Sequence, residues 1–149
     1  MLTIHAADEV RCTWDDPKPF EGGAVVVAGT RVEAVGPFDE LHERFPDARV
    51  RRWPGVLGPA RVHEGPLPDA PTPRERVHAV LKLGAVAVLE EHVDSPELRA
   101  AAERNGVHVA SSAQPVTVGE SGLADLAVFD RSGECIATVC SGRLVHRRR

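Results

Sequence analysis

Apolar and polar residues alternate through the first third of the chain, a pattern with the period of β-strands. In the run 31–35, Val32 and Ala34 fall on one side and the charged Arg31 and Glu33 on the other. The dipeptide Gly29-Thr30 separates this run from the preceding apolar run and favours a tight hairpin turn. The sequence therefore predicts strands at 2–6, 24–28, 31–35 and 49–53, with a short helix at 39–45 that Pro46 ends.

The last third has the same β character. Apolar runs at 125–130, 134–140 and 143–146 are separated by turns that contain Gly133 and Gly142. This spacing predicts a three-stranded antiparallel meander.

The middle of the chain follows a helical period instead. Residues 55–73 are rich in proline and are expected to form an extended connector or loop. Thr72 and Ser95 each precede a proline in N-cap spacing, so helices are expected to begin at Pro73 and Pro96. The apolar runs 85–89 and 107–110 are expected to be strands, the first buried on both faces. The order helix, strand, helix, strand indicates one βαβ unit with an extra leading helix, which makes the fold class α+β.

Composition places the chain among ordinary globular proteins and changes this picture little. The formal net charge of −4 over 149 residues gives no general basic field, so no nucleic-acid partner is expected. Cys12, Cys135 and Cys140 have no zinc-site spacing, and the last two lie in an apolar run as core residues do. Trp14 lies in a turn-rich stretch, where an exposed loop is expected. The N-terminal residues lack a signal-peptide pattern and no stretch reaches membrane-spanning length, so we expect a cytoplasmic protein without a membrane partner.

Both ends of the chain resemble one known family. The matching stretches are Gly23 to Pro37, Arg52 to Leu57, Gly122 to Asp130 and Val139 to Val145. They are similar to the imidazolonepropionase and aminodeoxyfutalosine deaminase branch of the amidohydrolase superfamily. The resemblance implies a β-sandwich-like composite domain assembled from both chain ends, residues 1–58 and 119–149. Residues 59–118 would then be a short inserted α/β (βαβ) segment, the remnant of a catalytic barrel.

The sequence departs from this family where the metal should bind. The family carries a His-x-His pair after its first barrel strand, and counting on from Pro54-Gly55 places those positions at Gly65 and Leu67. Neither residue can bind a metal. A complete barrel needs about 250 residues, far more than lie between Pro54 and Gly122. No metal, no other cofactor and no metal-dependent hydrolysis are therefore expected.

The carboxyl ends of the parallel strands offer an alternative, remnant site. If a short strand near 60–62 pairs with 85–89 and 107–110, one rim gathers His63, Glu91, His92 and Ser111, together with Glu64, Glu90, Asp94 and Ser112. A histidine among carboxylates can move a proton or bind a metal. A polar loop ahead of a helix has the same composition, and that interpretation is preferred for 90–95.

Three functions follow from these patterns. The preferred one is a non-catalytic binding or assembly module, a pseudoenzyme in which the apolar faces left by the lost barrel are covered by a partner chain, a second copy or rearranged loops, with a homodimer as the simplest case. The second is a hydrolase of carbon–nitrogen bonds or a small-ligand binder that uses the rim of His63, Glu91, His92 and Ser111. The third is a subunit that completes another incomplete amidohydrolase chain.

Overall fold

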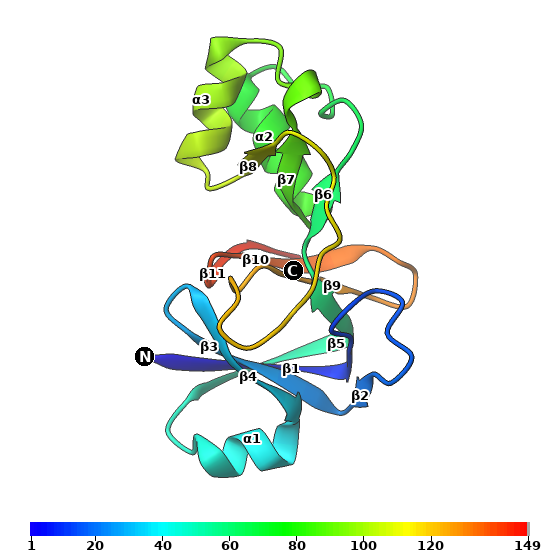
Figure 1. Ribbon diagram of the computed structural model, residues 1–149, viewed down its shortest axis with the longest axis vertical. Helices are drawn as coiled ribbons and strands as arrows, with labels where there is room; N and C mark the ends of the chain where they lie inside the picture. The colour runs from blue at the N-terminus through cyan, green and yellow to red at the C-terminus, as the bar shows by residue number, and fades with distance from the viewer. Residues whose placement is uncertain (149) are drawn as a thin grey trace.

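The computed structural model describes residues 1–148 and consists of a larger β-rich part and a smaller α/β part joined end to end (Figure 1). The larger part contains β1 (Leu2–Val10), β2 (Phe20–Glu21), β3 (Gly23–Ala28), β4 (Arg31–Pro37), α1 (Phe38–Arg44), β5 (Arg49–Pro59), β9 (Leu126–Phe129), β10 (Cys135–Cys140) and β11 (Arg143–Arg147). The smaller part contains β6 (Arg61–His63), α2 (Pro73–Lys82), β7 (Ala85–Leu89), the 3₁₀ turn η1 (Glu90–His92), α3 (Pro96–Arg104) and β8 (His108–Ala110). The expected α+β class is confirmed.

One eight-stranded sheet forms the larger part, with strands from both chain ends side by side. Its order is β11-β10-β9-β5-β1-β3-β4, with β2 paired to β1. The hairpin β3–β4 and the meander β9–β10–β11 are antiparallel, as the turn residues predict. The N-terminal and C-terminal strands meet where β5 pairs antiparallel with β9.

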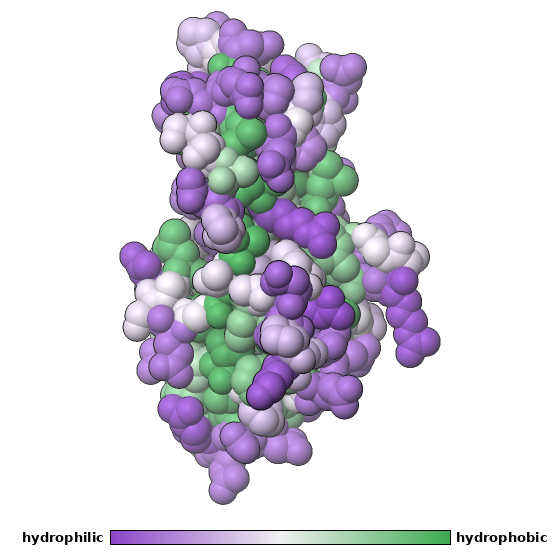
Figure 2. Space-filling model, turned by 45° about the vertical axis from the view of Figure 1, so that its right-hand side comes forward, coloured by the Kyte–Doolittle hydropathy of each residue, from purple (hydrophilic) through white to green (hydrophobic). Residues whose placement is uncertain are grey.

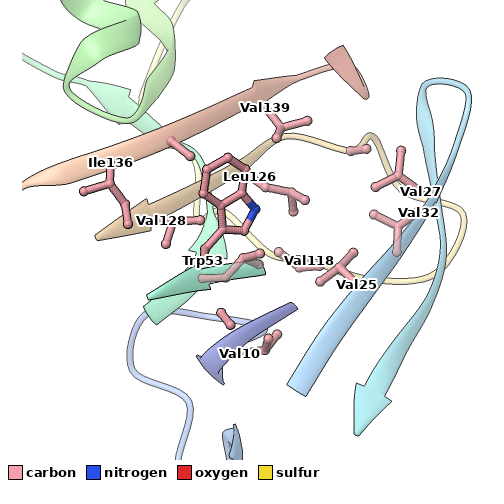
Figure 3. Packing of buried hydrophobic residues seen from close by; sticks show 14 residues of the cluster. Val10, Val25, Val27, Val32, Trp53, Val118, Leu126, Val128, Ile136 and Val139 are labelled. Carbon is pink, nitrogen blue, oxygen red and sulfur yellow. The ribbon is translucent and has the colours of Figure 1, made fainter. Parts of the chain in front are cut away.

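The sheet curls until its two ends approach each other around a core. The backbone N–H of Val32, on β4, donates to the carbonyl of Gly122 at 2.9 Å. Gly142, which precedes β11, has a φ of 82° and lies so close to the carbonyl of Gly29 that a Cβ would clash there. The enclosed cluster includes Val25, Trp53, Leu126 and Val139, from four different strands, and Figure 3 shows them converging. This closure gives the sandwich-like shape.

A second apolar cluster covers the outer face of the N-terminal strands. Leu41 of α1 is buried against Ile4, Val26 and Ala34, which alternate with the inward residues of β1, β3 and β4. The i, i+2 spacing of strand side chains accounts for both clusters.

The smaller part is a parallel three-stranded sheet in the order β6-β7-β8. The predicted caps are confirmed, because Thr72 Oγ1 accepts from the Glu75 N–H at 3.2 Å and Ser95 Oγ from the Leu98 N–H at 3.1 Å. The chain has β6 ahead of α2, so the unit is two consecutive βαβ crossovers rather than one with a leading helix. The sheet does not close into a barrel within residues 1–148.

Residues 55–73 are not one connector, contrary to what the prolines predict. β5 continues through Pro54 and Gly55 to Pro59, and β6 follows after Ala60. Gly55 makes this possible because its φ is 118°, and its N–H donates to Asp8 Oδ2 at 2.9 Å. Apart from Ala60, the part of this stretch outside strands and helices is 64–72.

Every residue of β7 is buried, as expected for a strand covered on both faces. Val86 and Val88 pack with Val77 of α2 and Leu98 of α3. Of the large apolar side chains in residues 1–148, those that are exposed are Met1, Leu83 and Leu123. The chain therefore covers β7 itself, without a second copy.

The two parts are joined by direct packing of helix ends on the large sheet. Thr138 Oγ1, fully buried on β10, donates to the carbonyl of Leu81 at 2.7 Å. A Cβ at Gly84 would lie 2.7 Å from Phe129 Cζ, so the turn after α2 sits directly on β9. Cys140 Sγ lies 3.3 Å from the carbonyl of Gly106, after α3. Cys135 and Cys140 are buried, as expected from their apolar surroundings.

None of the helices in residues 1–148 is long and apolar enough to cross a membrane.

Candidate functional site

The predicted rim lies along one edge of the small parallel sheet. His63 ends β6, the turn η1 with Glu91 and His92 follows β7, and Ser111 follows β8. Because the three strands are parallel neighbours, their carboxyl ends share this edge. The structure thus places the four candidate residues at the same end of the sheet, where the three strands terminate.

His63 and His92 each make their contact within their own loop, and Glu90 of the turn after β7 contacts helix α3. His63 Nε2 lies 2.9 Å from the carbonyl of Pro66, three residues on. His92 Nε2 is 4.0 Å from Glu91 Oε1, its neighbour in sequence, and Glu90 Oε1 accepts from Arg99 at 3.2 Å. No cluster of three or more His, Cys, Asp or Glu side chains within residues 1–148 has the arrangement of a metal site.

The two positions where the resemblance places metal ligands have other roles. Gly65 lies in the loop after β6, where a Cβ would meet no atom within 4 Å. Leu67 is 3% exposed and packs with Val77 and Val80 in the core of the α/β part. Its carbonyl also accepts from Arg76 Nη2 at 3.3 Å, which fixes the loop against α2. Leu67 is therefore part of the hydrophobic core.

A buried histidine that the sequence does not single out lies in the large sheet. His5 is 3% exposed, and its Nδ1 accepts from the indole Nε1–H of Trp53 at 3.2 Å. Burial, and to a smaller extent the nearby Arg51 cation, lowers the pKa of His5 to about 4. The ring is therefore neutral near pH 7. The sequence alone gives no partner for His5, because Trp53 is far along the chain and meets it only through the β1–β5 pairing.

Arg61 and two aromatic rings form a stack at the joint between the two parts. The Arg61 guanidinium lies 4.8 Å from the ring centre of Trp14 and 4.4 Å from that of Phe129. Trp14 Nε1 donates to the carbonyl of Pro59 at 2.8 Å. Trp14 does lie in a loop, but its side chain is half-buried over Gly58 rather than exposed. This arrangement holds the joint and presents no nucleophile.

A groove of about 770 Å³ lies between α2 and β11. Its lining includes the apolar Leu81, Leu144 and Val145 and the cationic Arg74 and Arg143. The remaining lining residues are Thr72, Glu75, His78 and Asn105, so Glu75 is the one carboxylate among them. Partial burial lowers the pKa of His78, and the nearby Lys82, His146 and Arg74 lower it further.

Comparison with known proteins gives one match to a family model. Residues 23–48 match the imidazolonepropionase-like composite domain of bacteria. This stretch covers β3, β4 and α1. No curated protein matches the chain in sequence.

Solved structures with a similar fold include several deaminases. Guanine deaminase from Bradyrhizobium japonicum is 14% identical with a TM-score of 0.54, over 73% of this chain and 34% of its own. E. coli guanine deaminase is 18% identical with a TM-score of 0.53, over 72% and 35%. An adenosine deaminase from Xanthomonas campestris, solved with bound zinc, is 13% identical with a TM-score of 0.52, over 78% and 36%. At these identities the likeness is one of fold, and the chain spans about a third of the length of these proteins.

Proposed function

We propose that this chain, which contains an imidazolonepropionase-like composite β-domain, is a non-catalytic binding or assembly module rather than a metal-dependent hydrolase. The composite domain gives it the frame of an amidohydrolase. The proposal concerns what remains of the catalytic part, residues 59–118.

The observation that carries the proposal is the burial of Leu67. A metal ligand must present a nitrogen, oxygen or sulfur atom to an open site. At this position the chain has an aliphatic side chain that is 3% exposed and packed against α2. Restoring a ligand here would require unpacking the core as well as changing the residue.

The proposed partner is another protein chain or a second copy. Completion of a different, incomplete amidohydrolase chain is one form of this role. Because the faces of β7 are already covered, a partner would bind a different surface of the chain.

Elemental analysis of untagged protein, together with its mass in solution, tests the proposal. We expect zinc and iron well below one atom per chain, and no deamination of guanine or adenosine. A His63→Ala/His92→Ala variant is expected to have the same metal content as the parent chain. Near-stoichiometric metal that this variant loses would contradict the proposal.

The second candidate function, a small-ligand or hydrolase site at the rim, is supported by the shared strand edge. His63 and His92 lie at the carboxyl ends of adjacent parallel strands, where α/β folds bind ligands. Metal content of the His63→Ala/His92→Ala variant separates a metal-dependent site at the rim from the non-catalytic role. In such a site the side chains of the rim would have to bind the metal.

A further inference from the structure

We infer that the groove between α2 and β11 is a docking site for an extended acidic peptide segment of a partner protein. This inference rests on the proposed binding role and names the class of partner. The groove is distinct from the rim, since His63, Glu91, His92 and Ser111 are not among the described residues that line it.

The groove between α2 and β11 has a local excess of positively charged side chains. Arg74 and Arg143 line it, and Lys82 lies near His78, whose pKa is lowered first by burial and then by this cation. Within residues 1–148, Arg74, Lys82 and Arg143 form no ion pair with a carboxylate. In a chain of formal net charge −4, this local excess of cations favours an anionic partner.

Strand β11, which lines the groove, forms an edge of the large sheet. β11 is the terminal strand of the large sheet, and among residues 1–148 its one strand neighbour is β10. In Figure 1 β11 lies at the side of the β-rich part that faces α2 and α3. An exposed edge strand can pair its backbone with an added strand. An extended peptide supplies that strand, whereas a nucleic acid does not.

The floor of the groove fits a peptide with apolar as well as acidic side chains. Leu81, Leu144 and Val145 supply apolar surface, and no Trp or Phe is among the described lining residues to stack on a base. Pairing of two β11 edges would bring the arginines of two copies together, which like-charge repulsion opposes. Figure 2 shows polar and apolar surface interleaved over the visible face of the molecule, without one large apolar field. An acidic extended segment meets these conditions together.

To test the inference, a nine-residue peptide of alternating Glu and Val, labelled with fluorescein, is titrated with the full chain. Binding is measured by fluorescence anisotropy. We expect saturable binding that weakens as salt is raised. The Arg74→Glu/Arg143→Glu variant is expected to bind at least about tenfold more weakly. The control Arg44→Glu/Arg131→Glu, with the same change of net charge at exposed residues outside the groove, is expected to bind within about twofold of the parent.

Hydrogen exchange shows where the peptide binds. We expect the amides of 143–147 to exchange more slowly with the peptide bound. Arg74→Gln/Arg143→Gln, which removes charge without reversing it, provides a milder variant, and circular dichroism checks that each variant is folded. No saturable binding, equal loss in the control, or unchanged exchange in β11 would each overturn the inference.

Two further probes separate this inference from the alternatives. A single-stranded oligothymidine that binds more tightly than the peptide and with the same sensitivity to Arg74 and Arg143 would overturn the inference in favour of nucleic acid. The His63→Ala/His92→Ala variant is expected to keep peptide binding. Loss of peptide binding therefore bears on the groove, while metal content bears on the proposed function.

Discussion

His5 is a titratable side chain held neutral inside a β-sheet. Its Nδ1 accepts from Trp53 Nε1–H, so this nitrogen must be unprotonated in the folded chain. Burial lowers the pKa of His5 to about 4 from 6.5. Between these values the unfolded chain binds a proton that the folded chain does not, so stability falls as the pH decreases from about 6.5 to about 4.

Replacing His5 with a residue that does not titrate tests this linkage. His5→Asn retains an oxygen that can accept a hydrogen bond from Trp53. In the parent chain the unfolding free energy is expected to fall by about 3 kcal/mol as the pH decreases over this range, and in His5→Asn this pH dependence is expected to be much smaller. Urea unfolding at several pH values measures it. His42→Asn, at an exposed residue of α1, is the control. Parallel pH profiles for the parent chain and His5→Asn would count against the buried neutral ring.

At the scale of elements, the turn after α2 sets how the two parts meet. Gly84 has a φ of 84°, and a Cβ there would lie 2.7 Å from Phe129 Cζ and 3.2 Å from Ala127 Cβ. Gly84→Ala is therefore expected to lower the unfolding free energy by about 2–4 kcal/mol. Gly65→Ala, where nothing lies within 4 Å, is expected to change it by less than about 0.5 kcal/mol. Urea unfolding compares the two, and equal effects would contradict a tight joint.

Elements whose signals are local could be predicted from the sequence. The hairpin at Gly29-Thr30 and the caps at Thr72 and Ser95 depend on residues within a few positions of each other, and all are confirmed. The full length of β5 could not be predicted, because proline and glycine at 54–55 are strand breakers unless a bulge accommodates them. The Arg61 stack and the groove could not be predicted because they join residues that are distant in sequence.

At the scale of the whole molecule, the core of the β-rich part draws on both chain ends. Val10 and Leu57 precede the α/β part, and Leu126 and Ile136 follow it, yet all belong to one cluster. The Thr138 hydrogen bond and the turn after α2 couple that core to the α/β part. We therefore expect one cooperative unfolding transition in urea, with the same midpoint by tryptophan fluorescence and by the helical circular dichroism signal. An earlier loss of the helical signal would mean that the α/β part unfolds separately.

Strands β5 and β9 pair with each other although the whole α/β part lies between them in the sequence. Pro59 lies opposite Leu126, and the Ala60 N–H donates to the carbonyl of Asp125 at 3.0 Å. Residues 60–125 therefore occupy the position of the loop in an antiparallel hairpin formed by β5 and β9. The entropy of closing a loop grows only with the logarithm of its length, so replacing this segment by one of about 250 residues would cost the hairpin about 1 kcal/mol. As far as loop closure is concerned, the same pair of strands can therefore hold a segment of barrel length or a short α/β unit.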